Sequence, residues 1–214
     1  MNTNIKIKTH DITREKLLLS AFCEIHRNGY QGASISNILS ATGLTKGALY
    51  HHFETKHALG LAVIDEVIAP NLDSLVFARL RNNPSPVQTL LEIIADVDDF
   101  LGEDNILLGC PLNNLIQEMS PLDEQFRHHL NMILENWQLT IQSALQHGQT
   151  HGLIRAETDC SAAALFIISA WEGCMGIAKN RQSVTSFKTC MQQLHGYVRS
   201  LLQANATAAD PDVN

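Results

Sequence analysis

The segment from Thr45 to Lys56 places hydroxyl, ammonium, phenol and imidazole groups within one short stretch. Lys46 can reach guanine O6 and N7 or a phosphate, and Thr45 can donate to a phosphate or place its methyl group against thymine. Tyr50 combines a flat apolar face with a hydroxyl group that can bond to a phosphate. These groups suit the backbone and base edges of DNA better than a hydrophobic core. The segment therefore predicts a DNA-reading element.

Other residues around this segment fit the same interpretation. Gly47 lets the backbone approach a duplex, although a glycine that serves helix packing is the alternative. Lys56 begins the next helix, where its amine and the backbone N–H groups form an anion site. Leu49 and Phe53 are apolar and are expected to anchor the helix in the core. The remaining candidate DNA contacts are short hydrogen-bonding side chains, namely Ser34, Ser36, His51 and His52.

Three helices are expected to position these groups. Thr13 is placed to cap the first helix, whose apolar residues recur every three to four positions until Asn28-Gly29 ends it. Ser34 caps a second, short helix, and Gly43 supplies a tight turn. Thr45 then caps the third. A three-helix unit of this kind is a helix-turn-helix domain.

These residues resemble the TetR family of transcriptional regulators. The resemblance covers roughly the first quarter of the chain and rests on Gly29-Tyr30, Ser34–Ile38, Gly43-Leu44 and Thr45–Lys56. It implies a homodimer paired through its last two long helices and a small-molecule effector held in the helical body. It also implies DNA contact by Lys46, Tyr50, His51 and Lys56.

The remainder of the chain is also expected to be helical, without an internal repeat or a strand pattern. The expected helices are Lys56–Arg81 (kinked or shortened by Pro70), Val87–Leu101, Cys110–Met119, a long helix from Ser120-Pro121 to Gly148, Ala162–Ala178 and Phe187–Leu201. Residues 82–86 are a break and 102–108 a loop. The sequence therefore predicts an all-α fold with a helix-turn-helix DNA-binding domain at 1–56, a helical effector-binding and dimerisation domain at 57–205, and a disordered tail at 206–214.

Charge is divided unevenly along the chain. Residues 1–60 hold seven basic and four acidic residues, a net charge of +3, whereas the remainder holds eight basic and 18 acidic residues, a net charge of −10. This asymmetry indicates that only the N-terminal end docks on DNA. No uninterrupted apolar run of about 18 residues and no signal-peptide pattern is seen, so a cytoplasmic protein without a membrane partner is expected.

The last two helices suggest how the chain assembles. Ala162–Ala178 is apolar almost all round and Phe187–Leu201 is amphipathic, which fits either half of a dimeric four-helix bundle or burial within one subunit. The family resemblance favours the dimer. A two-fold dimer presents two reading helices to two half-sites, so the operator is expected to be palindromic.

Aromatic and methionine side chains of the helical body can line an effector pocket, although a simple core role is the alternative for each. Glu172 is different, because it is a carboxylate inside the most apolar helix, where an unpaired charge is unfavourable. An ion pair across the dimer, exposure to solvent and contact with a cationic ligand are all open to it. The candidate effector-binding residues are Phe100, Cys110, Met119, Phe126, Trp137, Phe166, Trp171, Glu172 and Met175.

The five cysteines, at positions 23, 110, 160, 174 and 190, are odd in number and form no C-x-x-C motif. This pattern disfavours a disulfide framework and predicts mostly free thiols, with Cys23 in the core of the reading head. Cys110 stands at an expected helix start, where the helix dipole lowers a thiol pKa. A redox or electrophile switch at Cys110 is thus one interpretation and a small buried hydrophobe the other. His147 and His151 have the spacing of a helical metal chelate, but no third ligand is near, and neither a metal nor a cofactor is expected.

The leading hypothesis is a homodimeric, sequence-specific DNA-binding repressor that a small-molecule effector releases from a palindromic operator. One alternative is a repressor switched by oxidation or electrophile modification of Cys110. Another is a helical interaction protein without DNA binding. An enzyme with Cys110 as nucleophile is disfavoured, because no histidine neighbours it in the sequence.

Overall fold

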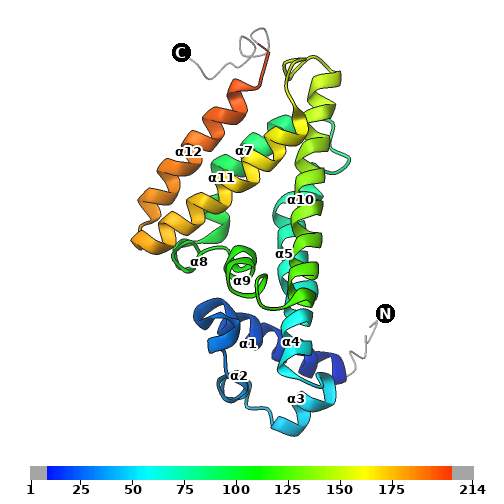
Figure 1. Cartoon of the computed structure of the whole chain (residues 1–214), viewed down its shortest axis with the longest axis vertical. Coiled ribbons are helices and arrows are strands. Elements are labelled where there is room, and N and C mark those ends of the chain that lie inside the picture. The colour runs from blue at the N-terminus through cyan, green and yellow to red at the C-terminus, as the bar shows by residue number, and fades with distance from the viewer. Residues whose placement is uncertain (1–8, 204–214) are drawn as a thin grey trace, which may run out of the picture. The chain divides into compact units, whose positions relative to one another are not determined.

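The computed structural model describes residues 9–203, with side chains from Ile12 onward. This part of the chain is helical, apart from turns and one isolated β-bridge between Ile154 and Leu202. The predicted all-α fold is confirmed (Figure 1). The helices are α1 Thr9–Gly32, α2 Ile35–Thr42, α3 Lys46–His52, α4 Lys56–Val63, η1 Ile64–Ile68, α5 Ala69–Leu72, η2 Asp73–Phe77, α6 Ala78–Leu80, α7 Pro86–Leu101, α8 Glu103–Leu108, α9 Pro111–Met119, α10 Glu124–Thr150, α11 Cys160–Arg181 and α12 Val184–Ser200.

The helices group into two compact units. The first combines the chain up to Asn71 with Asn114–Leu130, and the second combines Leu72–Asn113 with the chain from Asn131 onward. Each unit thus draws on two separate stretches of sequence. The tail predicted at 206–214 lies outside the described residues.

The first unit contains the predicted three-helix arrangement. Ser34, Thr45 and Thr55 each accept a hydrogen bond from the backbone N–H three residues later, at 3.0, 3.2 and 2.9 Å, so that each caps the helix after it. Gly43 has a φ of 69°, which a residue with a side chain rarely adopts, and so makes the turn between α2 and α3. The helix starts predicted at Ser34 and Thr45 are confirmed.

Two expectations for α1 are wrong. The helix begins at Thr9 rather than after Thr13. Gly29 has the positive φ, 74°, that the predicted helix end requires, and a short helical stretch continues beyond this kink to Gly32. Cys23 is exposed rather than in the core. The buried face of α1 is Leu17, Ala21 and Ile25, four residues apart, and Cys23 lies two residues past Ala21, which turns it to the other side.

Pro70 does not end the helix that begins at Lys56. The chain stays helical to Leu80, with π-helical segments η1 and η2 on either side of the four-residue α5 that contains Pro70. Proline lacks a backbone N–H and its ring crowds the preceding turn, and a wider π turn accommodates that disturbance. The predicted kink is therefore replaced by two π segments.

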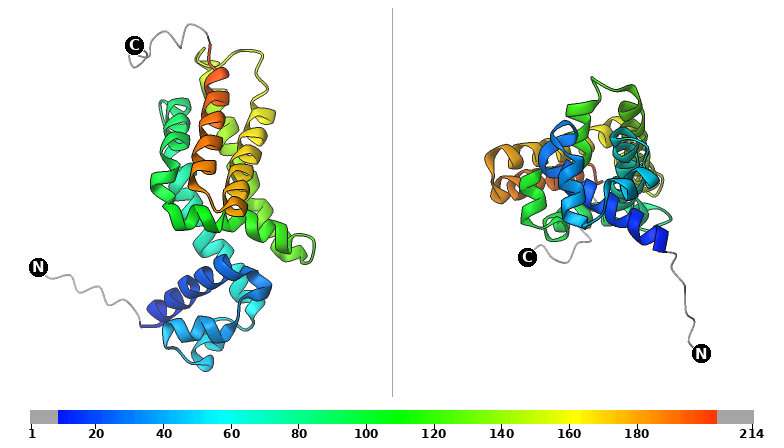
Figure 2. Two further views of the ribbon diagram at one scale, coloured as in Figure 1. Left: turned by 90° about the vertical axis from the view of Figure 1, so that its left-hand side faces the viewer. Right: turned by 90° about the horizontal axis from the view of Figure 1, so that it is seen from below.

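The core of the second unit confirms the predicted apolar stripes. On α10 the residues Trp137, Ile141 and Leu145 are at most 1% exposed. On α12 the buried residues are Phe187, Met191, Leu194 and Val198. The left view of Figure 2 shows α11 and α12 running side by side, and this packing helps to bury the stripe of α12.

The loop predicted at 102–108 is wrong. Glu103–Leu108 forms the short helix α8, with Gly102 at φ 72° before it and Gly109 at φ 81° after it. The acidic residues Glu103 and Asp104 lie in its first turn, where the helix dipole favours negative charge. Ile106 is fully buried, and this packing stabilises a helix too short to be stable alone.

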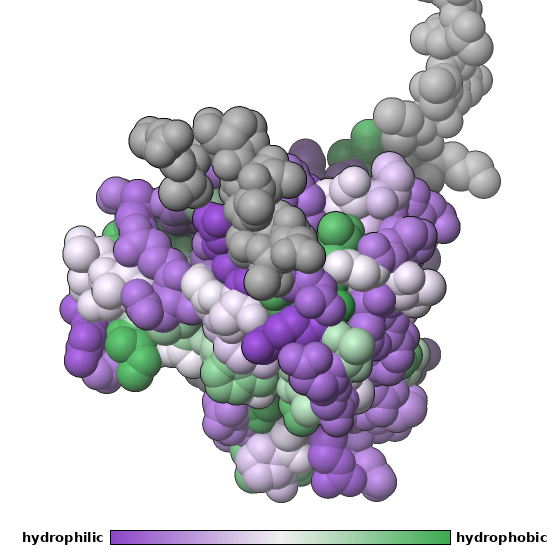
Figure 3. All heavy atoms as spheres, turned by 90° about the horizontal axis from the view of Figure 1, so that it is seen from above, coloured by the Kyte–Doolittle hydropathy of each residue, from purple (hydrophilic) through white to green (hydrophobic). Residues whose placement is uncertain are grey.

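Helix α11 is long and apolar enough to cross a membrane by length and hydropathy, with a mean hydropathy of 1.5. Half of that stretch is buried within this structure, however, including Ile167, Ile168 and Trp171. We therefore interpret it as a core helix of the second unit. The face of the molecule in Figure 3 is mostly hydrophilic, with hydrophobic side chains in small separate areas.

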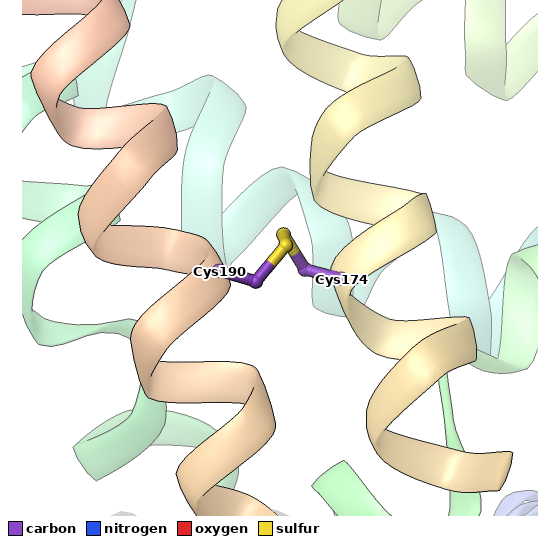
Figure 4. Close-up of a disulfide and its surroundings, with 2 residues drawn as sticks. All are labelled: Cys174 and Cys190. Atoms are coloured by element: carbon purple, nitrogen blue, oxygen red, sulfur yellow. A yellow bond between two sulfur atoms is a disulfide. The ribbon is translucent and has the colours of Figure 1, made fainter. Parts of the chain in front are cut away.

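The prediction that most cysteines are free thiols is correct for three of them and wrong for two. Cys23, Cys110 and Cys160 are free, whereas Cys174 and Cys190 form a disulfide between α11 and α12 (Figure 4). Their Cα atoms are 5.5 Å apart although the residues are 16 positions apart in the sequence. The pairing arises from the packing of two helices, and no motif spacing signals it.

Candidate nucleic-acid interface and buried carboxyl site

Helix α3 turns its apolar side chains inward and its polar ones outward. Leu49 is fully buried and Phe53, at the end of the helix, is 4% exposed, so both anchor α3 as predicted. Tyr50 is 49% exposed. The other exposed positions on this helix are Lys46, Gly47 and His51. The structure thus brings four of the predicted DNA contacts onto one accessible face.

Gly47 has no packing role in this structure. A Cβ atom added there would meet its nearest neighbour, Oγ1 of Thr45, at an ordinary 3.7 Å. Thr45 is exposed and uses its hydroxyl as an acceptor in the α3 cap, which leaves donation to a phosphate compatible with capping. The open space at Gly47 therefore favours the interpretation in which the backbone approaches a ligand.

The start of α2 is already occupied by a carboxylate. Glu24 Oε1 accepts hydrogen bonds from the backbone N–H of Ser34 at 3.2 Å and from Nδ2 of Asn37 at 2.8 Å. Glu24 thereby provides the negative charge that a helix N-terminus favours. Ser36 is exposed nearby. Ser34 and Ser36 can bind a phosphate here only beside this carboxylate, which the sequence analysis missed.

Two of the predicted DNA contacts, Lys56 and His52, also contact other residues of the first unit. The Lys56 ammonium donates to the Gln31 carbonyl at 3.3 Å and lies 4.8 Å from the centre of the Tyr30 ring. His52 is half-buried, with its ring 6.3 Å from that of Phe53. Lys56 therefore ties α4 to the end of α1 in this conformation, and its contact with DNA stays a prediction.

Glu118 on α9 was also missed by the sequence analysis. Its carboxylate oxygens accept hydrogen bonds from the backbone N–H groups of Tyr30 at 2.7 Å and Gln31 at 2.8 Å. A Cβ atom at Gly29 would lie 2.9 Å from Oε2 of Glu118. The Gly29-Tyr30 pair thus combines a positive φ with close approach of a carboxylate, and only glycine meets both conditions without strain.

In the second unit a thiol and a carboxyl group meet inside the core. Cys110 is 7% exposed and Glu172 is 8% exposed. The Cys110 thiol interacts with the Glu172 carboxyl, but a thiol is a weak donor, and neither carboxyl oxygen has a full hydrogen-bond partner. Burial raises the pKa of Glu172 to about 7.

Cys110 does not have the lowered pKa that its position at a helix start predicts. Burial, followed by the negative charge of Glu172, raises the pKa of the Cys110 thiol well above its ordinary value. Hydrogen bonds from the backbone of Asn113 and Leu112 do act in the predicted direction, but they are the smaller effect. Cys110 is thus a protonated, buried thiol here, as in the alternative interpretation of a small buried hydrophobe.

Trp171 directly precedes Glu172 on α11 and packs against a second tryptophan, Trp137 of α10. The rings of Trp137 and Trp171 meet edge to face, with 5.7 Å between their centres. Trp137 is 1% exposed, and its Nε1–H is buried without a hydrogen-bond partner. Met175, one helical turn after Trp171, is 3% exposed. These residues, with Cys110 and Glu172, form the part of the predicted effector set that the second unit buries.

The other predicted effector residues lie elsewhere. Phe100 is 61% exposed beneath Arg79, and Phe166 is 51% exposed against Tyr197. Phe126 is buried in the first unit, where its ring lies 4.6 Å from that of Tyr30, and Met119 is buried in that unit too. The structure therefore divides the predicted set rather than gathering it around one space.

Two further features of the second unit bear on ligand binding. An open groove of about 740 Å³ lies between the turn after α6 and helix α10, and its walls include Pro84, Leu139 and His147. The rings of His147 and His151 stack with 4.2 Å between their centres. Among residues 9–203, no group of three His, Cys, Asp or Glu side chains is arranged to hold a metal ion.

Two family models match this chain, one in its N-terminal part and one over its second half. Residues 17–63 match the family model described as bacterial regulatory proteins, tetR family, and residues 86–194 match the model of the tetracyclin repressor-like C-terminal domain. The chain is 32% identical over 165 residues to the HTH-type transcriptional repressor DhaR of Mycobacterium sp. strain GP1, covering 75% of this chain and 81% of that repressor.

Solved structures agree. A TetR transcriptional regulator from Chloroflexus aurantiacus superimposes with a TM-score of 0.77 and 28% identity, covering 90% of this chain and 97% of that one. The reduced form of Escherichia coli NemR superimposes with a TM-score of 0.77 at 21% identity, covering 90% and 97%. The second likeness is one of fold.

Proposed function

The chain belongs to the TetR family of bacterial transcriptional regulators, and on that premise we propose that it is a homodimeric repressor that binds a palindromic operator and is released by a small-molecule effector. The family consists of DNA-binding regulators rather than enzymes, so an enzymatic role for Cys110 is dropped. As regulators of this family act on DNA in the cytoplasm, we propose the same location here.

The observation that carries DNA binding is the outward face of α3. Lys46, Tyr50 and His51 are exposed there, while Leu49 and Phe53 hold the helix in the core. Lysine at a helix start suits guanine or phosphate, and the Tyr50 hydroxyl suits a phosphate. At Gly47 an added Cβ atom would meet only Oγ1 of Thr45, at an ordinary 3.7 Å, so this position gives the duplex room to approach.

The apolar face of α11 supports the homodimer. Leu165, Phe166 and Ile177 are 54, 51 and 50% exposed although α11 is a core helix on its other side. Gly173 and Gly176 share this exposed face, and added Cβ atoms there would meet nothing within 4 Å. A large apolar face with glycines at its centre suits close packing against a second copy. Pairing of this kind presents two α3 helices to the two half-sites of a palindrome.

DNA binding is tested by titrating the protein against a labelled duplex of the intergenic region upstream of its gene. The titration is repeated at several salt concentrations with excess unrelated DNA. Lys46→Ala and Tyr50→Ala are each expected to weaken operator binding about tenfold or more while leaving helical content unchanged. Lys46→Ala is also expected to reduce the salt dependence.

Arg155→Ala is the matched control, since Arg155 is an exposed cation of the second unit whose partner is Glu157 at 3.8 Å. Loss of affinity in the two α3 variants but not in the control supports the proposal. Wild-type affinity in both α3 variants contradicts it, and favours a helical interaction protein without DNA binding.

A switch at Cys110 is the second candidate mechanism of release. The observation in its favour is that Cys110, a buried free thiol of the second unit, interacts with the Glu172 carboxyl group, so that modification there disturbs a buried polar pair. Burial and the raised thiol pKa oppose rapid reaction. Treatment with N-ethylmaleimide should release wild-type protein from the operator but not Cys110→Ala if this switch operates. Equal behaviour of the two proteins excludes it.

A further inference from the structure

Packing within the second unit does not explain why a carboxyl group is buried at Glu172. A carboxyl group with both oxygens buried and without a full hydrogen-bond partner is unfavourable in an apolar core. Its neighbours on the same face of α11 are Ile168 and Met175, which offer no donor. A leucine at this position would avoid the difficulty.

Two of the explanations open to Glu172 fail on its burial. The side chain is 8% exposed and its oxygens are sealed within the second unit, so it neither faces solvent nor reaches a second copy of the chain. The only ionisable group that acts on it among the described residues is the Cys110 thiol. The carboxyl group is therefore an acceptor whose one neighbour is a weak, replaceable donor.

The surroundings define what could replace the thiol. Trp137 and Trp171 supply aromatic rings, and Met175 a flexible, polarisable wall. Carboxylate and indole faces both attract positive charge, and indole is the strongest neutral partner for a cation. An anion would be repelled by Glu172, and no basic side chain acts on that carboxyl to receive one.

We propose that the effector is a small organic cation, whose charged nitrogen displaces the Cys110 thiol from the Glu172 carboxylate and whose apolar body packs against Trp137 and Trp171. This inference rests on the proposed release by an effector, and it adds the chemical class of the ligand and the residue that selects it. The ligand replaces a weak donor by a full positive charge, so binding satisfies the buried carboxyl group. No covalent bond forms or breaks.

Ligand binding at this site can be followed by the intrinsic tryptophan fluorescence of the protein. Its two tryptophans, Trp137 and Trp171, are the only ones in the chain, and they pack against each other where Trp171 directly precedes Glu172 on α11. Intrinsic fluorescence of the full-length protein is therefore titrated with benzyltrimethylammonium, which stays charged at every pH. The same titration with 2-phenylethanol and with phenylacetate supplies neutral and anionic probes on the same aromatic body.

The expected result is saturable quenching or a spectral shift with the cation, and at least about tenfold weaker binding of the alcohol and the anion. Glu172→Gln keeps the shape of the side chain without the charge, and should weaken cation binding about tenfold or more. Glu157→Gln, which neutralises an exposed carboxylate of the same unit, should bind as wild type.

The pH dependence supplies an independent test. Glu172, with a pKa of about 7, changes from about one-tenth to about nine-tenths ionised between pH 6 and 8. Affinity for the permanent cation should therefore rise about ninefold over that range in wild-type protein and stay constant in Glu172→Gln. A neutral ligand that accepts a hydrogen bond from the protonated acid would show the opposite trend, and that outcome would overturn the proposal.

Equal cation binding by wild type and Glu172→Gln also overturns it, as does no response to the cation up to about 10 mM, above the millimolar range of the weakest specific binding. The operator assay is run separately with the same cation. Cation binding at Glu172 without release from DNA would sustain the binding site and refute its role as effector site. Loss of DNA binding by the protein alone would refute the proposed function without touching the fluorescence result.

Discussion

At the scale of single residues, environment decides chemistry more than position in the sequence does. Cys110 follows the rule for a helix start, in that backbone groups of Leu112 and Asn113 lower its pKa, yet burial and Glu172 raise it further. Removal from water acts on the whole charge of a thiolate, whereas a helix start supplies only partial charges. Where the two compete in an apolar core, burial dominates.

The pKa of Glu172 makes a prediction about stability. Its folded-state pKa of about 7 lies above the 4.5 of an unperturbed glutamate, so the folded protein holds a proton that the unfolded chain releases. Stability should therefore fall as pH rises from about 4.5 to 7, by up to about 3 kcal/mol, and level off above that. Urea unfolding at pH 5 and pH 8 measures this loss.

Glu172→Gln should remove the loss of stability that ionisation of Glu172 causes, so the variant becomes more stable relative to wild type as pH rises. Glu157→Gln, at an exposed carboxylate, should follow the wild-type curve. If stability depends on pH in the same way in wild type and Glu172→Gln, the prediction is contradicted. That result would show that ionising the Glu172 carboxyl group does not destabilise the folded protein.

Gly47 allows the packing and DNA-contact interpretations to be separated. Since an added Cβ there meets only Oγ1 of Thr45, at an ordinary 3.7 Å, Gly47→Ala should stabilise the protein by about 1 kcal/mol through helix propensity. If a duplex approaches this face, the same variant should bind operator about tenfold more weakly, because the methyl group keeps the backbone away. Thermal unfolding and the operator titration measure the two effects.

Gly43→Ala is the contrasting variant. Its φ of 69° disfavours any side chain, so the substitution should lower stability by about 1 kcal/mol. A Gly47→Ala protein that is more stable and binds DNA as wild type would remove Gly47 from the proposed interface.

At the scale of elements, pairs of helices decide features that neither helix signals alone. The Cys174–Cys190 disulfide exists because α11 and α12 pack together over their buried stripes. The Glu118 carboxylate meets the backbone of Tyr30 and Gln31 from a helix more than 80 residues later. Both interactions require the fold to be formed before the partners are neighbours.

The disulfide should contribute measurably to stability. Closing a loop of 16 residues restricts the unfolded chain and corresponds to about 3 kcal/mol. Cys190→Ser, or a reductant added to the wild type, should therefore lower the melting temperature by several degrees, on the scale of about 2–4 °C per kcal/mol for a chain of this size.

Cys23→Ser serves as control, since Cys23 is an exposed free thiol. It should melt as wild type under oxidising conditions and lose the same stability on reduction. Unchanged melting of the wild type on reduction would mean that this bond constrains the unfolded chain little.

At the scale of the whole molecule, the proposed function depends on two copies acting together. A single α3 reads one half-site, and a palindrome requires two held at a defined spacing. The exposed apolar residues Leu165, Phe166 and Ile177 of α11 are the surface that we propose for this pairing. The effect of a charge there can be measured without knowing the operator.

Ile177→Glu should weaken dimerisation about a hundredfold or more, because the interface would bury a carboxylate without a partner. Analytical ultracentrifugation measures the change, and operator affinity should fall with it. Leu122→Glu is the control, as Leu122 is 65% exposed in the turn before α10 and lies outside the α11 face. A dimeric Ile177→Glu protein would mean that a different surface pairs the subunits.

The sequence by itself determined helices α2 and α3 and which face of α3 is buried. The caps at Ser34 and Thr45, the turn at Gly43 and the inward Leu49 all depend on residues within a few positions, so local spacing is sufficient to predict them. The buried stripes of α10 and α12 were equally predictable, because their period follows from helix geometry alone.

Only the tertiary structure decided what those helices bring together. The carboxylate of Glu24 at the start of α2, the disulfide between α11 and α12, and the sealed Cys110–Glu172 pair join positions 10 to 62 residues apart. Helical periodicity states which face of a helix is apolar but not which partner covers it. Hydrogen bonding, thiol pairing and desolvation depend on that partner, so their outcome at Cys110, Cys174 and Glu172 had to come from the packed fold.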